Sequence, residues 1–213
     1  MFIHFPRTGG TYIKAKLRQP DFCLMGDESP GAEGYRDVYE YQHPAYGHAK
    51  QLFIERSDLW NAGMWTVVRN PYDWNMSYWS WMYSDRMAFE DYAKALPHQL
   101  DPPKVHLRMK QGEKMKYALW HQKNAKEGFM FYRWWVQFGG TLKPPDVTVY
   151  RFEDGIGNIL KRVTGKSYNG ERQNSSVRDA HYTEQLAEAV YYKERPMFNA
   201  FGYEKDSWRQ WGC

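Results

Sequence analysis

Two short segments of this sequence carry the residue types that proteins use to hold anions. The first is the loop at residues 6–11, which follows an apolar run and precedes a stretch with helical spacing. Its glycines allow backbone N–H groups to turn toward an anion at a helix start. Thr8 and Thr11 add hydroxyl donors, and Arg7 adds a fixed positive charge. The alternative is an ordinary structural turn, because a glycine loop alone is only moderately specific.

The second segment begins where a predicted strand, residues 64–68, ends at Arg69. Asn70 suits a helix cap and Pro71 suits the first helical position, so a helix should start here. Ser77 follows Arg69 by eight positions, about two turns into that helix. The two side chains can therefore converge on one phosphate. The alternative is that Arg69 is a structural salt-bridge partner.

Predicted strands alternate with predicted helices around these segments. Such alternation is typical of an α/β sheet that is mostly parallel, with ligands at the carboxyl ends of its strands. The strand ends at Phe5 and Val68 therefore belong to the same edge. The expected strands cover residues 2–5, 64–68 and 147–152, with a possible short strand in 46–50 that ends near His48. The expected helices cover residues 10–18, 54–61, 71–83, 114–123, 129–138, 156–164 and 183–193, and loops are expected at 21–41, 97–103 and 166–178.

Composition and charge are those of a globular protein with an uneven charge distribution. The 213 residues fit one domain, 1–213, and aromatic residues make up 18% of them. We expect most aromatic side chains in the core, with stacking on sugars or bases as the alternative. Residues 104–143 contain seven Lys and two Arg against two Glu. This segment is either a solvated helix face or a basic rim that attracts an anionic substrate.

Other classes of protein are not favoured by the sequence. Cys23 and Cys213 provide neither a disulfide framework nor the spacing of metal ligands. We find no signal peptide, and no apolar run approaches the roughly 20 residues that span a bilayer. We therefore expect a soluble, cytoplasmic protein that binds no metal, nucleic acid or membrane. The sequence predicts no oligomeric state.

Together, the segments PRTGGT and VVRNPYDWNMS resemble the sulfotransferase family that uses 3′-phosphoadenosine 5′-phosphosulfate (PAPS). In that family, a P-[KR]-[TS]-G-[GST]-[TS] loop after the first strand binds the 5′-phosphosulfate. A strand that ends in Arg, with a Ser eight residues later, binds the 3′-phosphate. The resemblance is closest to the carbohydrate branch, which includes heparan sulfate 2-O-sulfotransferases. It implies a three-layer α/β fold like that of the P-loop NTPases, with a mostly parallel central sheet flanked by helices.

The resemblance extends along the chain and implies a set of binding residues. Residues 150–154 are similar to the segment that follows a later strand in the family, and residues 201–203 are similar to its FGY ending. Asn174-Ser175-Ser176 is similar to a loop that closes over the nucleotide, with a solvated turn as the alternative. The residues that would bind PAPS are Arg7, Thr8, Gly9, Gly10, Thr11, Tyr12, Arg69, Ser77, Asn174 and Ser175.

Two residues would take part directly in the transfer. The usual loop Lys is Arg7 here, and Arg should stabilise charge on the leaving group rather than act as an acid. The acceptor hydroxyl also needs a base, for which His is suited near neutral pH. Tyr46-Gly47-His48 resembles the segment that carries the base in the carbohydrate branch, so we expect His48 in this role. His43 and Glu55 are the next candidates, and His48 as a plain surface residue is the alternative.

The sequence thus predicts a PAPS-dependent sulfotransferase that acts on a hydroxyl of a glycan or small molecule. A P-loop nucleotide kinase is a second reading, although the GxxxxGK[ST] pattern and a plain magnesium ligand are absent. A third is a non-catalytic module that binds nucleic acid or an anionic glycan through residues 104–143. Such a module would show a steep dependence on salt.

Overall fold

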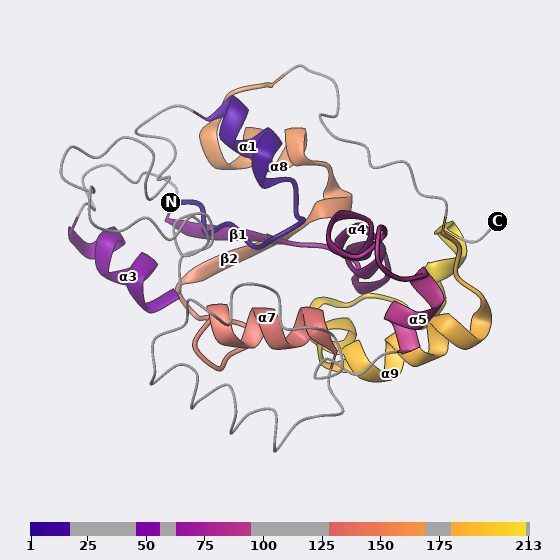
Figure 1. Ribbon diagram of the computed structural model, residues 1–213. Coiled ribbons are helices and arrows are strands. Elements are labelled where there is room, and N and C mark those ends of the chain that lie inside the picture. Colours follow the sequence, from indigo (N-terminus) through magenta and orange to yellow (C-terminus); the bar gives the residue numbers. More distant parts are fainter. Residues whose placement is uncertain (18–45, 56–62, 95–127, 169–179, 212–213) are drawn as a thin grey trace. The chain divides into compact units, whose positions relative to one another are not determined.

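The computed structural model describes residues 1–17, 46–55, 63–94, 128–168 and 180–211 (Figure 1). The predictions for residues 21–41, 97–103 and 114–123 lie outside these ranges, as do those for most of 54–61 and 166–178. The chain divides into two compact units, and each takes a segment from both halves of the sequence. The first unit is Met1–Asn70 with Trp134–Val177, and the second is Pro71–Arg133 with Arg178–Cys213.

A small parallel sheet lies at the centre of the first unit. Strand β1, Met64–Val68, pairs with strand β2, Val147–Arg151, in a register that sets Met64 beside Val147 and Val68 beside Arg151. Both strands are confirmed, although the second ends one residue before the predicted limit. Every residue of β1 is buried, as expected for a strand covered on both faces.

The predicted first strand, residues 2–5, is extended beside β1 but pairs with it in only one bridge, Phe2 to Trp65. The prediction of a full strand is therefore wrong. Side chains donate to the next three carbonyl groups of this segment, of which Ile3 O is the next acceptor that a longer ladder with β1 would use. Thr66 Oγ1 donates to Ile3 O at 2.7 Å, Gln137 Nε2 to His4 O at 2.8 Å, and Thr8 Oγ1 to Phe5 O at 2.6 Å.

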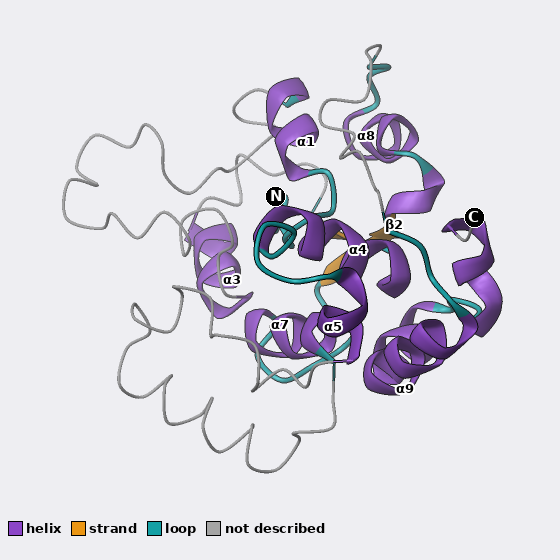
Figure 2. Cartoon of the chain, turned by 45° about the vertical axis from the view of Figure 1, so that its right-hand side comes forward, coloured by secondary structure: helices purple, strands orange, loops and turns teal. Residues whose placement is uncertain are grey.

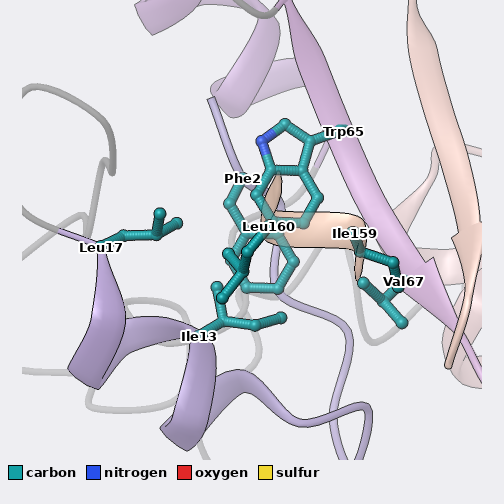
Figure 3. Packing of buried hydrophobic residues seen from close by; sticks show 7 residues of the cluster. All are labelled: Phe2, Ile13, Leu17, Trp65, Val67, Ile159 and Leu160. Carbon is teal, nitrogen blue, oxygen red and sulfur yellow. The ribbon is translucent and has the colours of Figure 1, made fainter. Parts of the chain in front are cut away.

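Two helices cover one face of this sheet. Helix α1, Gly10–Lys16, and helix α8, Ile156–Thr164, confirm the predicted helices, with α1 ending two residues early. Their apolar side chains pack on the sheet in one cluster (Figure 3), which consists of Phe2, Ile13, Leu17, Trp65, Val67, Ile159 and Leu160. Alternation along the extended segment turns Phe5 away from this cluster, and its ring contacts Trp134 of helix α7, Phe129–Gln137, at 5.0 Å between centroids.

Helix α3, Tyr46–Glu55, replaces the short strand that we expected within 46–50. That prediction is wrong for a local reason. Residues 48–52 are His, Ala, Lys, Gln and Leu, and most of these favour a helix, whereas β-branched residues are absent from 46–53. The Lys50 ammonium also bonds to the Asp146 carboxylate, 2.6 Å away, just before β2.

The second unit is helical. It contains α4, Pro71–Met82, α5, Phe89–Lys94, the first half of α7, and α9, Glu184–Phe201. The helices α4 and α7 are confirmed, and α5 was not predicted. Helix α9 runs past Lys193, where we expected its end, and through Pro196 to a left-handed Gly202. Met197 and Phe198 are buried beyond the proline, and their packing offsets the hydrogen bond that Pro196 cannot donate.

The described part of the chain is therefore a mixed helix and strand structure with a parallel two-stranded sheet (Figure 2). Short 3₁₀ helices, η3 at Phe152–Asp154 and η4 at Lys205–Trp211, complete it. None of the helices in the described ranges has the length and hydropathy needed to cross a membrane.

Candidate functional site

Three segments with polar residues follow the carboxyl ends of the extended segment, β1 and β2. They are the loop 6–11, the pair Arg69-Asn70, and η3. Because β1 and β2 are parallel and residues 1–3 run alongside β1, these segments meet at one edge of the sheet. We call this region the sheet edge. It lies entirely within the first unit.

Arg69 joins the three segments. Its side chain is buried, with 7% exposed, and its Nη1 atom donates to the backbone carbonyl of Arg7 at 3.0 Å. The guanidinium also lies over the Phe152 ring, 4.6 Å from the centroid. The two predicted motifs, 62 residues apart in sequence, are thus in direct contact. The guanidinium therefore contacts both the loop 6–11 and η3.

A backbone contact reinforces the same junction. The N–H of Asn70 donates to Glu153 Oε1 of η3 at 2.7 Å. This bond holds the turn between β1 and α4 against the turn that follows β2. Arg151, the last residue of β2, lies beside Val68 in the register, so three arginines belong to this edge: Arg7, Arg69 and Arg151. The edge is suited to an anion.

The loop itself has an unusual backbone. Arg7 has a φ of 63°, a conformation that costs energy for a residue other than glycine. Gly9 has a φ of 82°, and a Cβ there would lie 3.1 Å from the Phe152 ring. Gly9 is therefore required both by its backbone conformation and by its contact with η3. The loop therefore has a defined backbone conformation that depends on Gly9.

The polar groups of the loop are only partly as we expected. The buried Thr8 hydroxyl donates to Phe5 O, so its proton serves the loop and not an outside anion in this conformation. Thr11 is exposed, and Tyr12 is half-buried with Lys16 Nζ 5.5 Å from its ring centroid. Gly9 precedes α1 without a side-chain cap, and Ile13 N is the first amide that bonds back to Gly9 O, at 3.0 Å. The amides of residues 10–12 precede that first bond.

Ser77 is placed in α4, where it is buried with 1% exposed. It belongs to the second unit, whereas Arg69 belongs to the first. The structure describes each unit by itself, so the convergence of these two residues on one phosphate stays a prediction. Asn174 and Ser175 lie outside the described residues, and their predicted contact with the nucleotide is also untested.

Two of the three candidates for the base, His48 and Glu55, belong to helix α3. His48 lies in α3, and the bond from Lys50 to Asp146 holds this helix beside the amino end of β2. The loop 6–11 lies beyond the opposite ends of the strands. The His48 side chain is not described, so its role stays a prediction. Glu55 is exposed and accepts from Gln51 Nε2 at 2.9 Å, and His43 lies outside the described residues.

The second unit contains a buried polar group that the sequence analysis missed. Glu194 of α9 is 1% exposed, and its Oε1 accepts from Met130 N at 2.8 Å and from Asn75 Nδ2 at 3.3 Å. Its Oε2 accepts from Phe131 N at 2.8 Å. Burial raises the pKa of this carboxyl to about 7, although these hydrogen bonds act in the opposite direction. We call Glu194 and its three donors the Glu194 centre.

A signal for this centre was present in the sequence. Val190, Glu194 and Met197 follow the spacing of a buried helix face, and Glu194 occupies a position that an apolar residue would usually fill. Arg133 is a similar case: it is buried, donates to the Tyr78 hydroxyl at 2.9 Å, and lies over two aromatic rings. Burial lowers its pKa to about 9.

Comparisons with known proteins give no family for the chain. No protein-family model, no curated protein and no solved structure matches it. Within the described ranges, no group of three or more His, Cys, Asp or Glu side chains is placed to hold a metal ion.

Proposed function

We propose that the protein is a PAPS-dependent sulfotransferase that acts on a hydroxyl group, with a three-layer P-loop-like fold. The observation that carries the proposal is the bond from Arg69 to the carbonyl of Arg7, with Phe152 beneath the same guanidinium. Two sequence motifs that would hold opposite ends of one nucleotide thus adjoin at the carboxyl edge of a parallel sheet. This is the edge where open α/β sheets bind their ligands.

In this proposal the loop 6–11 holds the 5′-phosphosulfate. Backbone N–H groups of residues 10–12 face the anion from the start of α1, and the Arg7 side chain neutralises charge on the phosphate that leaves. Arg69 and Ser77 hold the 3′-phosphate. Asn174 and Ser175 lie beside the nucleotide, and the Tyr12 ring borders the loop.

The transfer itself exchanges one bond to sulfur for another. The acceptor oxygen forms a bond to the sulfur atom while the bond from sulfur to the bridging oxygen of the 5′-phosphate breaks. The electron pair of that bond stays on 3′-phosphoadenosine 5′-phosphate, and the hydroxyl proton passes to a base. His48, the base expected from the sequence, belongs to α3 beside the amino end of β2, so the proposal leaves this base unassigned. The acceptor is a glycan or a small molecule with a hydroxyl, and no metal ion is needed for charge neutralisation.

Calorimetry with three compounds tests this function. We expect 3′-phosphoadenosine 5′-phosphate to bind and to raise the unfolding temperature, whereas ATP with Mg²⁺ and a single-stranded oligonucleotide should do neither. Binding of ATP with Mg²⁺ alone would support a kinase instead. Salt-dependent binding of the oligonucleotide alone would support a nucleic-acid module. If the bisphosphate does not bind, the proposal is wrong.

A further inference from the structure

The imidazole of His4 occupies a defined place behind the loop 6–11. His4 lies on the same face of the extended segment as Phe2, and the two rings are stacked with centroids 5.8 Å apart and an interplanar angle of 28°. The backbone on either side is fixed, because Ile3 N donates to Trp65 O at 2.7 Å and His4 O accepts from Gln137 Nε2. The ring is therefore held in position by the sheet.

That ring lies directly against Gly10, the first residue of α1. A Cβ atom at Gly10 would lie 2.0 Å from His4 Nε2 and 2.3 Å from both Cδ2 and Cε1. Such distances are far below any real carbon contact, so a side chain at position 10 and the His4 ring cannot coexist as placed. Unlike Gly9, Gly10 does not have a positive φ. The neighbouring ring, and not the backbone conformation, therefore requires glycine here.

The contact acts on one end of the helix. Ile13 and Leu17, further along the chain, anchor α1 in the apolar cluster (Figure 3). His4 instead contacts the residue at which the loop turns into the helix. The part of the chain that it fixes is thus the part whose amides face the anion in the proposed function.

We propose that His4 is a positioning residue for the anion site. This inference rests on the proposed function. The imidazole sets how closely the start of α1 approaches the sheet, and so it sets the direction of the amides that bind the 5′-phosphosulfate. His4 and Gly10 form a matched pair, because the glycine leaves the space that the ring fills.

A double-mutant cycle tests the pair, with binding measured by calorimetry. Gly10→Ala should weaken 3′-phosphoadenosine 5′-phosphate about tenfold, since the new methyl displaces either the ring or the start of α1. His4→Ala should weaken it about threefold, because the start of α1 loses its support. In the double variant the methyl enters the vacated space, so the affinity should return to within about threefold of the His4→Ala value.

A second ligand separates positioning from general damage. Adenosine 3′-phosphate lacks the 5′-phosphate, and its affinity should be equal in all four proteins. Gly157→Ala is the matched control, because a Cβ at this position in the first turn of α8 meets only Tyr168 O at 3.8 Å. It should leave both affinities unchanged. Thermal unfolding of each variant without ligand verifies that the compared proteins are folded.

The inference is overturned if the two substitutions act independently on the affinity, or if both ligands lose affinity equally. A merely structural role would produce the second result. These failures require a wild-type protein that binds the bisphosphate. If the wild type does not bind it, the proposed function fails first, so the two failures are distinguishable.

Discussion

The two units of this molecule each contain a buried arginine over an aromatic ring and a glutamate that accepts from backbone N–H groups. At the sheet edge, Arg69 lies over the Phe152 ring, and Glu153 accepts a hydrogen bond from Asn70 N. In the second unit, Arg133 lies over the rings of Phe129 and Tyr78, and Glu194 accepts hydrogen bonds from the backbone N–H groups of Met130 and Phe131. The same pairs of chemical groups therefore occur in two different environments.

Solvent access separates the two glutamates but not the two arginines. Glu153 is exposed and Glu194 is buried, whereas Arg69 and Arg133 are 7% and 8% exposed. Glu194 and Arg133 are both buried, and burial raises the pKa of the carboxyl and lowers the pKa of the guanidinium, which favours the neutral form of each. A perturbed pKa is often a sign of a functional site. Here the two groups with shifted pKa values, Glu194 and Arg133, lie in the core of the second unit, where their hydrogen bonds and ring contacts serve packing.

The largest expected effect is on the Glu194 centre. Glu194→Ala should lower the free energy of unfolding by about 4 kcal/mol, because it leaves several buried donors without an acceptor and also creates a cavity. Glu153→Ala should lower it by less than about 1 kcal/mol, since water can replace an exposed carboxylate. Urea unfolding measures both. Equal losses would mean that burial does not distinguish the two regions.

The pH dependence of stability should come from the same carboxyl group. The pKa of Glu194 is raised from 4.5 in the unfolded chain to about 7 in the folded protein, so its favourable contribution is complete below pH 4.5 and is lost as the pH rises through 7. The loss is at most about 3 kcal/mol. Urea midpoints between pH 4.5 and 8 should therefore fall in the wild type, and Glu194→Gln should remove this slope.

A neighbouring group gives an internal control for that experiment. Burial lowers the pKa of Lys193 to about 8, so its unfavourable contribution is present below pH 8 and is relieved only above it. Its effect has the opposite sign and a higher pH range. A slope between pH 4.5 and 7 that persists in Glu194→Gln would contradict the assignment to Glu194.

Local signals in the sequence were enough to predict several elements correctly. The run Met64–Val68 is mostly apolar and ends in three β-branched residues, and the following Asn-Pro marks the start of α4 without any tertiary information. Residues 46–50 show the limit of such signals. The sequence suggests a short strand there, whereas the structure has the ten-residue helix α3. Helix α9 shows another limit: Pro196 usually ends a helix, and only the burial of Met197 and Phe198 explains why it continues.

The candidate site was predictable as two motifs but not as a set of contacts. The sequence shows Arg7 and Arg69 as separate positive charges, and nothing local indicates that one donates to the carbonyl of the other. The contact between His4 and Gly10 is equally invisible, because it depends on how α1 crosses the extended segment. Such contacts join residues that are distant in sequence or on different elements, so they follow from the packing of the unit.

The two arginines should respond differently to the same substitution. Arg69→Met should weaken 3′-phosphoadenosine 5′-phosphate about 30-fold, which is about 2 kcal/mol, since a charge-assisted contact to phosphate is lost. Arg133→Met should leave that affinity unchanged in the folded protein. It should lower stability by about 1–2 kcal/mol, because the Tyr78 hydroxyl loses its donor and two rings lose a cation. Calorimetry and thermal unfolding of both variants provide the two readouts.

The smallest expected effect concerns an exposed charge pair that is neither enclosed nor at the sheet edge. The side chains of Lys50 and Asp146 are 46% and 44% exposed, so Lys50→Ala should cost about 0.5 kcal/mol or less and should not change the affinity for the bisphosphate. Lys50 belongs to α3 at the amino end of β2, whereas Arg69 lies past the carboxyl end of β1. A clear loss of affinity in Lys50→Ala would show that general positive charge attracts the anion. Unchanged affinity, beside a large loss in Arg69→Met, would assign binding to the specific contacts of the sheet edge.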